Sequence, residues 1–560
     1  MKLRILFCGT LICALALVAS QCSRPVSTAS RSEIPHLRKQ GTATQLIVDG
    51  KPFLVLGGEL SNNGPTSVEY MKPKWSMLAA AKLNTVLAGV SWAQVEPAEG
   101  KFDFTVPDGI IRDARSHNLR LILLWFASWK NSWSSYPPDW VKKDFDRFPR
   151  VQITGGKSIE VLSPFSDANR DADAHAFAAL MRHLKEVDRE HTVLMIQVEN
   201  EIGLPSEPGE FRDRSPLAEK AYQGPVPKEL MDFLQQHKDT LIPEFRQVWQ
   251  AAGFKTSGTW EEVFGKGTAT SEIFMGWYFA HYIGRVAEAG KAEYPLPLYM
   301  NTWLLEFAKP GGRTSNIGTP MPSLMDVWRA GAPGIDIYSP DNATDFVVFC
   351  AKYTQSGNPL FIPEEESGPE GAARALYAFG HHDAIGFSRM RGGVERRPAP
   401  DTALIDMYGL ILQLQPLILE HQGDGTMSAV FLRPNDPPQK VKVGNYTVEG
   451  AFARSRLTAG APPLEPVYGP LGNVSSPTAA AIFIAVGPDE YYAAGNGVAV
   501  TFSPNTPGPP LAGLATVEEG SFVNGRWVPV RRLAGDDTAQ GQHLNLRNMG
   551  IQRLTLYRYR

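Results

Sequence analysis

The chain has 560 residues, of which 43% are hydrophobic, 10% aromatic and 20% charged. This composition is globular and excludes a disordered, collagen-like or coiled-coil protein, and the length predicts several domains or one large barrel with an appendage. With 55 Lys and Arg against 58 Asp and Glu, the net charge of −3 leaves no basic surplus for nucleic acid, and four cysteines exclude a disulfide scaffold.

The first twenty residues predict an export signal. Lys2 and Arg4 precede the apolar residues 5–18, and small residues follow. These fourteen apolar residues are too few to span a bilayer core about 30 Å thick, so we expect a cleaved signal peptide over 1–20 rather than a membrane anchor. We therefore expect a periplasmic or extracellular protein without a transmembrane segment. A lipid anchor at Cys22 is the less favoured alternative, because the residue before it is not small.

A catalytic barrel is expected over residues 43–424, after a flexible tether over 21–42 that is rich in Ser, Arg, Thr and Pro. Helical patterns, such as 174–190 and 273–289, alternate here with short apolar runs of the buried-strand type. There are eight such runs, at 53–58, 84–89, 119–126, 193–198, 296–301, 334–338, 359–363 and 384–388. Eight evenly spaced units favour a (β/α)8 TIM barrel, an α/β fold, over the alternative of an open doubly wound sheet.

One connection is unusually long. About 95 residues separate the fourth and fifth apolar runs, and they include helical patterns near 227–252. Because this excursion leaves from the rim where barrel active sites form, we expect it to wall the site.

A second domain is expected over residues 425–560. The pattern here changes to strands of period two, at 498–502 and 526–530, and Asn524-Gly525 is a strong signal for a two-residue hairpin turn. We expect a β-sandwich that packs on the barrel as a structural module, with sugar binding as the alternative role.

Two of the apolar runs end in carboxylates. Residues 193–198 lead directly into Glu199-Asn200-Glu201, and residues 359–363 lead into Glu364-Glu365-Glu366. These are the fourth and seventh runs, whose C-terminal ends face one another across a barrel mouth, where barrel enzymes do their chemistry. Two carboxylates about 5 Å apart serve a retaining glycosidase as acid/base and nucleophile. Strand alternation alone does not choose between Glu199 and Glu201, nor between Glu364 and Glu366.

These motifs resemble those of glycoside hydrolase family 35, the β-galactosidases. Residues 197–203 resemble the family's acid/base motif, residues 91–104 its Trp, Glu-Pro and Gly-x-Phe-x-Phe signature, and residues 57–59 the end of its first strand. Residues 361–364 resemble the nucleophile strand of a bacterial branch with a small C-terminal β-domain. The resemblance covers roughly residues 45–425. An aromatic residue that more distant members carry near Gly89 is absent, and the loop after the third strand is of the bacterial-branch type.

The resemblance implies roles for individual residues. It implies that Glu201 is the acid/base, that Asn200 contacts the sugar's 2-hydroxyl, and that Glu364 is the nucleophile. It further implies that Tyr338, which ends the sixth run, hydrogen-bonds the nucleophile; a rim aromatic is the alternative.

Other polar and aromatic residues near strand ends are candidates for sugar contacts. Aromatic faces stack on pyranose rings, and amides or carboxylates bind hydroxyls. The candidates are Glu59, Glu96, Trp129, Asn131, Asn301 and Trp303. Trp129 belongs to a spacing of four, Trp125-Trp129-Trp133, that is equally typical of a core helix face, and Glu59 or Glu96 can equally brace loops. We expect no metal or other cofactor, because His381 and His382 lack further ligands at a recognisable spacing.

The sequence therefore predicts a retaining β-galactosidase that removes terminal β-galactosyl groups from oligosaccharides or plant-polysaccharide side chains. Another retaining β-glycosidase on the same barrel, such as a glucosidase or glucanase, is one alternative. A barrel that binds sugars without cleaving them is the other. The expected partner is a carbohydrate substrate and not nucleic acid, and the sequence is silent on the oligomeric state.

Overall fold

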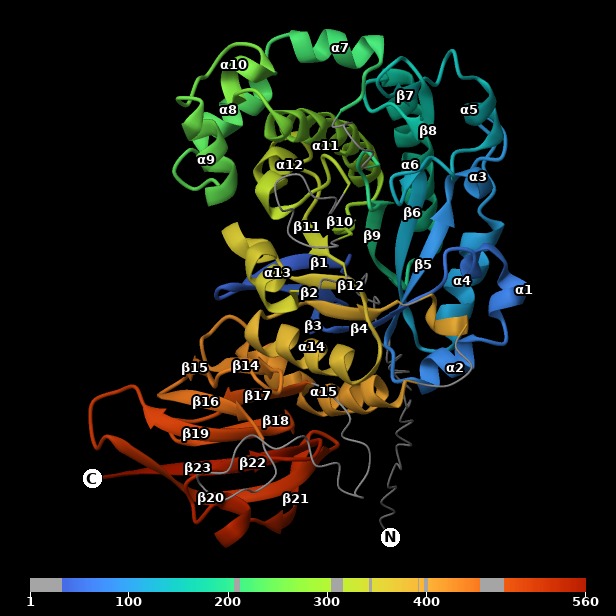
Figure 1. The fold of residues 1–560 in the computed structure, drawn as a ribbon. Coiled ribbons are helices and arrows are strands. Elements are labelled where there is room, and N and C mark those ends of the chain that lie inside the picture. The colour runs from blue at the N-terminus through green and yellow to red at the C-terminus, as the bar shows by residue number, and fades with distance from the viewer. Residues whose placement is uncertain are drawn as a thin grey trace, which may run out of the picture.

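A computed structural model describes residues 33–205, 212–303, 316–341, 345–390, 392–396, 401–453 and 478–560. The predicted signal peptide over 1–20 and Cys22 lie outside these residues. Eight parallel strands form one sheet in the order β11, β10, β9, β6, β5, β4, β13, β12. The two strands at the ends of this order, β11 and β12, lie side by side, so the sheet closes into a barrel (Figure 1). The predicted (β/α)8 fold is confirmed.

Each of the eight apolar runs singled out in the sequence forms one barrel strand. The strands are β4 (Val55–Glu59), β5 (Thr85–Ser91), β6 (Arg120–Lys130), β9 (Val193–Asn200), β10 (Leu298–Thr302), β11 (Ile337–Pro340), β12 (Phe361–Glu365) and β13 (Gly386–Arg389). They are apolar on both faces because one face packs in the barrel interior and the other packs against helices.

Helices follow the barrel strands and cover the outside of the barrel. The covering helices are α1 (Val68–Met71), α2 (Trp75–Ala80), α3 (Trp92–Val95), α4 (Thr105–Ser116), α5 (Asp139–Lys143), α6 (Asp167–Val187), α11 (Thr268–Glu293), α12 (Met325–Gly331), α13 (Phe346–Tyr353), α14 (Gly368–His381) and α15 (Thr402–His421). Among the described residues, α15 is the one helix long and apolar enough to cross a membrane by length and composition, and here it packs on α14, β17 and β20.

The predicted tether is corrected at its C-terminal end. His36–Gln40 form strand β1, which pairs with β2 (Ala43–Val48), and β2 pairs with β3 (Lys51–Phe53). Leu46 and Val48 of β2 join the apolar cluster inside the barrel. These residues are ordered because their backbone groups pair in a sheet and the β2 side chains are buried.

The long excursion after β9 forms four helices: α7 (Pro216–Gln223), α8 (Lys228–Gln236), α9 (Pro243–Ala251) and α10 (Trp260–Phe264). They lie at the end of the barrel that also carries α5 and the hairpin of β7 (Arg150–Gln152) and β8 (Ser158–Leu162) (Figure 1). The backbone N–H of Ile242 donates to Asp326 of α12 at 2.6 Å. Lys352 of α13 pairs with Glu244 of α9 at 2.9 Å. The excursion is thus anchored on α12 and α13.

Two antiparallel sheets form the C-terminal part, as the period-two pattern predicts. One contains β14 (Met427–Leu432), β17 (Ala479–Ala485), β18 (Glu490–Asn496), β23 (Gly550–Tyr559), β20 (Leu511–Val523) and β21 (Arg526–Arg532). The other contains β15 (Gln439–Val443), β16 (Tyr446–Phe452), β19 (Val498–Pro504) and β22 (Leu544–Leu546). A shared apolar cluster fills the space between them. The expected hairpin at Asn524-Gly525 joins β20 to β21, with φ values of 50° and 74°.

The larger sheet packs on the barrel through α14 and α15. Phe431 and Ile482 of this sheet belong to the same buried cluster as the barrel helices. His381 lies at this junction, stacked on Tyr377 and bonded to Ser428 at 2.9 Å. The histidine pair at 381–382 therefore belongs to the contact between the two parts of the chain. Cys350 of α13 is a buried free thiol.

Candidate active site

The two carboxylates at the end of β9 point to different sides of the barrel wall. Glu199 and Glu201 both have left-handed backbone conformations, with φ of 61° and 47°. These conformations interrupt the alternation of a regular strand. Glu199 accepts hydrogen bonds from the backbone of β6, whereas Glu201 enters the barrel mouth beside Glu364. The choice that the sequence left open is thus decided by the backbone at the strand end.

A similar irregularity sorts the carboxylates of β12. The register between β12 and β13 shifts between Ile362 and Glu365, which indicates a bulge. Glu365 turns outward and pairs with Arg374 of α14 at 2.8 Å, while Glu364 turns into the mouth. Because Glu365 is fully buried, its pKa is raised to about 7 despite the arginine.

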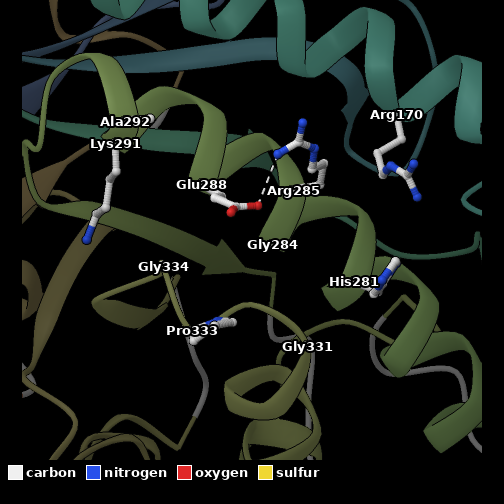
Figure 2. Close-up of a pocket in the computed structure, with 10 residues that line it drawn as sticks. All are labelled: Arg170, His281, Gly284, Arg285, Glu288, Lys291, Ala292, Gly331, Pro333 and Gly334. Carbon is white, nitrogen blue, oxygen red and sulfur yellow. Dashed lines mark hydrogen bonds and ion pairs between the residues drawn. The ribbon is translucent and has the colours of Figure 1, made fainter. Parts of the chain in front are cut away.

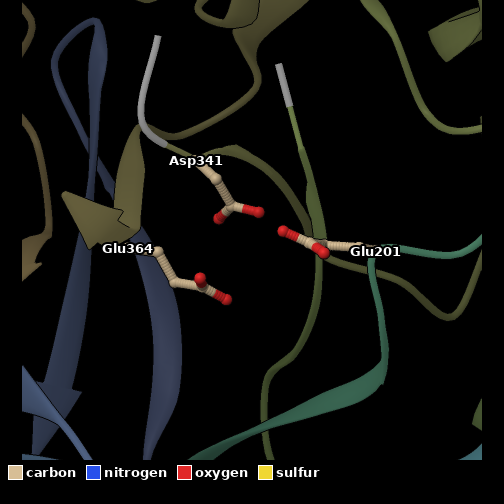
Figure 3. A group of neighbouring side chains, drawn as sticks. All are labelled: Glu201, Asp341 and Glu364. Carbon is tan, nitrogen blue, oxygen red and sulfur yellow. The ribbon is translucent and has the colours of Figure 1, made fainter. Parts of the chain in front are cut away.

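Three carboxyl groups converge in the mouth. Carboxylate oxygens of Glu201, Asp341 and Glu364 all lie within 4.8 Å of one another (Figure 3). Glu201 and Glu364 come from the fourth and seventh barrel strands, as the sequence predicted. Asp341 follows β11 and was not predicted. Its signal in the sequence was the same as for the other two, namely a carboxylate directly after an apolar strand.

Two asparagines hold the nucleophile candidate. Asn200 donates to Glu364 Oε1 at 3.2 Å, and Asn301 donates to the same oxygen at 3.1 Å. The Asn301 amide also donates to Asp341 at 2.8 Å, and its carbonyl oxygen accepts the backbone N–H of Glu201 at 3.0 Å. Neutral amide donors stabilise a carboxylate in its ionised form. The two amides thus fix the Glu364 carboxylate beside Asp341 and Glu201.

A tight turn after β6 brings one donor to Glu201 and a second donor to the neighbouring Asn200. Lys130 and Trp133 pair across the turn, and the central residues Asn131 and Ser132 have φ of 50° and 66°. The Asn131 amide donates to Glu201 Oε2. Lys130 Nζ donates to the side-chain oxygen of Asn200 at 2.6 Å. Positive φ at two non-glycine residues is a costly conformation that is typical of functional sites.

The electrostatics of the mouth favour the protonated form of Glu201 near neutral pH. Burial, followed by the repulsion of Glu364, raises the pKa of Glu201 to about 8. Lys130 and the Asn131 amide act in the other direction. A carboxyl group that remains neutral near pH 7 is the form needed for proton donation.

One further acid, Glu59, and Tyr299 are buried within electrostatic reach of the carboxyl cluster. Burial, with Glu364 as the next cause, raises the pKa of both Glu59 and Asp341 well above the usual values. Both carboxylate oxygens of Glu59, Oδ1 of Asp341 and the hydroxyl of Tyr299 have no hydrogen-bond partner among the described residues. Tyr299 is within electrostatic reach of Glu59, Asp341 and Glu364. Buried polar atoms without a partner are uncommon, so they mark this region as a candidate site for a polar ligand.

Three predicted site residues are corrected. Trp129 is fully buried between the strand and the helices, where its ring meets Phe279 and Tyr282 and its indole N–H bonds Leu162. It therefore faces away from the mouth. Its spacing from Trp125 marks a buried strand face of β6, and not a helix.

Tyr338 and Glu96 are also engaged elsewhere. Tyr338 lies in the layer between strands and helices, with its ring 6.4 Å from that of Trp328, and no hydrogen bond links it to Glu364. The carboxylate of Glu96 accepts from the indole of Trp92 and the backbone N–H of Gly100, both at 2.8 Å. It braces the loop after β5. Trp303 remains a candidate, since it follows β10 and is 40% exposed.

A groove on the outside of the barrel is distinct from this mouth. It lies over α11 and the turn after α12, and it is lined by Arg170, His281, Gly284, Arg285, Glu288, Lys291, Ala292, Gly331, Pro333 and Gly334 (Figure 2). Its cations are paired: Arg285 with Glu288 at 3.1 Å, and Lys291 with Asp336 at 2.6 Å. None of the three clustered carboxyl groups of the mouth lines this groove.

Comparisons with known proteins indicate a likeness to β-galactosidases. Residues 65–263 match the family model described as Beta-galactosidase, that of glycoside hydrolase family 42. Residues 404–545 match a domain of unknown function, DUF5597. The predicted likeness to β-galactosidases is confirmed, whereas the assignment to family 35 in particular is not.

Individual relatives are similar over part of their length. A β-galactosidase of Xanthomonas manihotis is 29% identical over 200 residues, which are 34% of this chain and 30% of that protein. The chain thus spans less than a third of the curated relative it matches. Among solved structures, the β-galactosidase of Bacillus circulans sp. alkalophilus has a TM-score of 0.44 at 15% identity, covering 66% of this chain and 57% of that one. That of Rahnella sp. R3 has the same TM-score and identity, with 65% and 57% covered.

Proposed function

We propose that this protein is a retaining β-galactosidase. The observation that carries the proposal is the pair Glu201 and Glu364, whose oxygens approach within 4.8 Å at the mouth of the barrel. Carboxyl groups about 5–5.5 Å apart are typical of retaining glycosidases, whereas inverting enzymes need about 6.5–9.5 Å to admit a water molecule. The match of residues 65–263 to a β-galactosidase family supports the choice of sugar.

In the first step, Glu364 attacks the anomeric carbon of the sugar. The bond from that carbon to the glycosidic oxygen breaks, and Glu201 transfers its proton to this oxygen, so the leaving group departs as a neutral alcohol. A covalent ester between the sugar and Glu364 remains. The raised pKa of Glu201, caused first by burial, suits the donor role.

In the second step, Glu201 acts as a base. It is now ionised, and it takes a proton from a water molecule that attacks the anomeric carbon from the side the leaving group left. The ester bond breaks, Glu364 regains its charge, and the product has the configuration of the substrate. Glu201 ends protonated, ready for the next substrate.

The sugar itself is held by the groups without partners in the mouth. Glu59, Asp341 and Tyr299 offer acceptor or donor atoms to its hydroxyls, and Asn200 and Asn301 lie beside the nucleophile. Trp303 is 40% exposed at the rim, where its ring can stack on the next sugar unit. We propose terminal β-galactosyl groups of oligosaccharides or plant-polysaccharide side chains as substrates.

Export forms part of the proposal. It rests on residues 1–20, where a basic start precedes fourteen apolar residues. An exported enzyme meets polysaccharides too large to enter a cell.

A panel of nitrophenyl glycosides tests the function. We expect the highest kcat/KM on the β-galactoside, and NMR of the early reaction should show β-galactose as the first product. Preference for the β-glucoside would favour the glucosidase alternative. Tight sugar binding without turnover of any glycoside would favour the non-catalytic barrel, and α-galactose as first product would refute retention.

The rate should depend on pH in a way set by Glu201. Since this group must be protonated in the first step, kcat/KM should fall as pH rises through about 8, to which burial and the repulsion of Glu364 raise its pKa. We call this fall of kcat/KM at high pH the alkaline limb of the pH profile. Initial rates measured from pH 4 to 10 check it. In Glu201→Gln the limb should disappear, because the amide does not titrate in this range; a limb that persists there belongs to another group.

A further inference from the structure

The pairing between β6 and β9 is interrupted next to the active site. Trp125 is opposite Val198, and the next pair is Lys130 opposite Asn200. Four residues of β6, 126–129, therefore face the single residue Glu199. A regular ladder cannot pair such unequal lengths.

The side chain of Glu199 accepts the backbone hydrogen bonds that a paired residue of β9 would otherwise accept. Its carboxylate accepts the backbone N–H groups of Ala127 at 3.3 Å, Ser128 at 2.9 Å and Trp129 at 2.7 Å. Glu199 is fully buried, as are these three residues. Without this acceptor, three buried N–H groups would lose a hydrogen bond, so the segment could not keep its present path.

A second buried acid on α6 supports the same segment. Asp173 accepts the indole N–H of Trp125 at 2.9 Å and the hydroxyl of Ser128 at 2.6 Å. Tyr282 of α11 completes the cluster, with its hydroxyl 2.7 Å from that of Ser128. Burial, followed by the charge of Asp173, raises the pKa of Glu199 well above its usual value. The negative charge of Asp173 therefore disfavours the ionised form of Glu199.

The supported segment leads directly into the catalytic site. Lys130, the last residue of β6, and Asn131 follow it, and Asn131 donates to Glu201. Asn200, the last residue of β9, and Glu201 follow Glu199 itself. The backbone N–H of Asn131 also donates to the carbonyl oxygen of Asn200 at 3.2 Å. Glu199 thus positions both partners of the contact between Asn131 and Glu201. It holds the segment before Asn131 by hydrogen bonds, and it precedes Glu201 by two residues in the chain.

We propose that Glu199 is a positioning residue that, by accepting the three N–H groups of residues 127–129, holds Asn131 against the acid/base Glu201 and Lys130 against the adjacent Asn200. The inference rests on the proposed function for the role of Glu201. It goes beyond that function in assigning a task to the carboxyl group that does not enter the mouth.

The titration of Glu201 reports this positioning. Asn131 and Lys130 both lower the pKa of Glu201, so their displacement should raise it. The charged or titratable groups that face Glu201 are Lys130 from β6, Glu59 from β4, Asp341 after β11 and Glu364 from β12. Glu199 touches none of the last three, so its removal acts through the β6 turn.

The test compares pH profiles of Glu199→Ala and Asn131→Ala. We expect Glu199→Ala to lower kcat/KM by about 100-fold, the loss typical of a misplacement near 1 Å, and to move the alkaline limb to higher pH. Asn131→Ala should move the limb in the same direction. The double variant should show little further shift, because both changes remove one contact.

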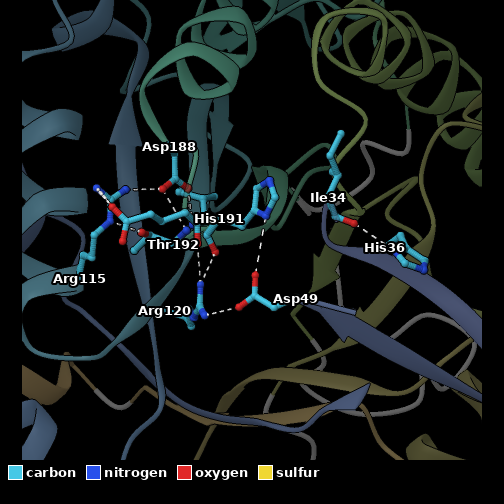
Figure 4. Close-up of polar contacts among 10 residues, drawn as sticks. Ile34, His36, Asp49, Arg115, Arg120, Asp188, His191 and Thr192 are labelled. Atoms are coloured by element: carbon cyan, nitrogen blue, oxygen red, sulfur yellow. Dashed lines mark hydrogen bonds and ion pairs between the residues drawn. The ribbon is translucent and has the colours of Figure 1, made fainter. Parts of the chain in front are cut away.

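Asp188→Ala is the matched control. Asp188 is a buried carboxylate directly after α6 that accepts the backbone N–H groups of Thr192 at 2.9 Å and of Val193, the first residue of β9, at 2.7 Å. It also pairs with Arg115 at 2.6 Å (Figure 4). This variant should lower Tm and leave the alkaline limb in place. The inference would be overturned if the alkaline limb of Glu199→Ala lay at the same pH as that of the wild type. It would also be overturned if the pH shifts of the two single variants added up in the double variant.

A conservative variant and a second measurement complete the test. Glu199→Gln keeps one acceptor oxygen and should lose less than Glu199→Ala, with a smaller shift of the limb. Any chromogenic glycoside that the wild type hydrolyses serves as substrate for this comparison. If the wild type hydrolyses other glycosides but not galactosides, the proposed function is refuted and the test of Glu199 still stands. A crystal structure of Glu199→Ala should show Asn131 away from Glu201; an unchanged contact would contradict the inference.

Discussion

Replacing Glu364 by glutamine is expected to lower kcat by roughly 10⁴–10⁶-fold, the range seen when a catalytic nucleophile is removed. The amide cannot form the glycosyl ester, so the double displacement has no first step. The fold should be kept, because the carbonyl oxygen of a glutamine can accept the bonds that Asn200 and Asn301 now donate at 3.2 and 3.1 Å.

Glu366 provides the control for the Glu364→Gln variant. Glu366→Gln changes the same charge two residues further along, outside the carboxyl cluster of the mouth, and should retain most of the activity. Both variants are compared with wild type by kcat on the best nitrophenyl glycoside and by Tm. Turnover of Glu364→Gln within tenfold of wild type, at an unchanged Tm, would refute the nucleophile assignment.

Replacing Glu201 by alanine should have the second-largest effect, and one that depends on the leaving group. General acid catalysis contributes about 10²–10⁴-fold, so hydrolysis of an oligosaccharide should fall by that amount. A dinitrophenyl leaving group needs no proton, and its release should be much less affected. The second step then becomes slow, because no base activates the water, and a burst of released phenol is expected.

Azide distinguishes the two carboxyl roles. In Glu201→Ala, azide needs no general base, so it should restore turnover and give the β-galactosyl azide, because it attacks the covalent intermediate from the side of the leaving group. In Glu364→Ala, azide that replaces the nucleophile should give the α-azide instead. The reverse pattern of products would exchange the two assignments.

The barrel strands could be predicted from the sequence because their signal is local. A strand covered on both faces is a short continuous apolar run, and each of the eight runs forms a barrel strand. The strand at His36–Gln40 was missed because it is polar and half exposed, so its pairing with β2 leaves no apolar pattern.

The direction of individual side chains was less predictable. Tyr338 and Trp129 were expected in the mouth because they stand near strand ends, but both face the helices. Asp341 was overlooked although it directly follows β11, and it lies with Glu201 and Glu364 in the mouth. Proximity to a strand end predicts the right edge of the barrel, whereas the face depends on each strand's local path.

The sequence by itself determined the barrel, its strand order along the chain, and the two strand ends that carry the acids, since these follow from runs of apolar residues and the residue types after them. Only the tertiary structure decided which acid of each group enters the mouth. Glu199 is held away from the mouth by hydrogen bonds from the N–H groups of β6, more than 70 positions earlier in the chain. Glu365 is held away from it by its ion pair with Arg374 on the following helix. These partners come from other elements of the fold, and the bulges they stabilise reverse the alternation that a sequence pattern assumes.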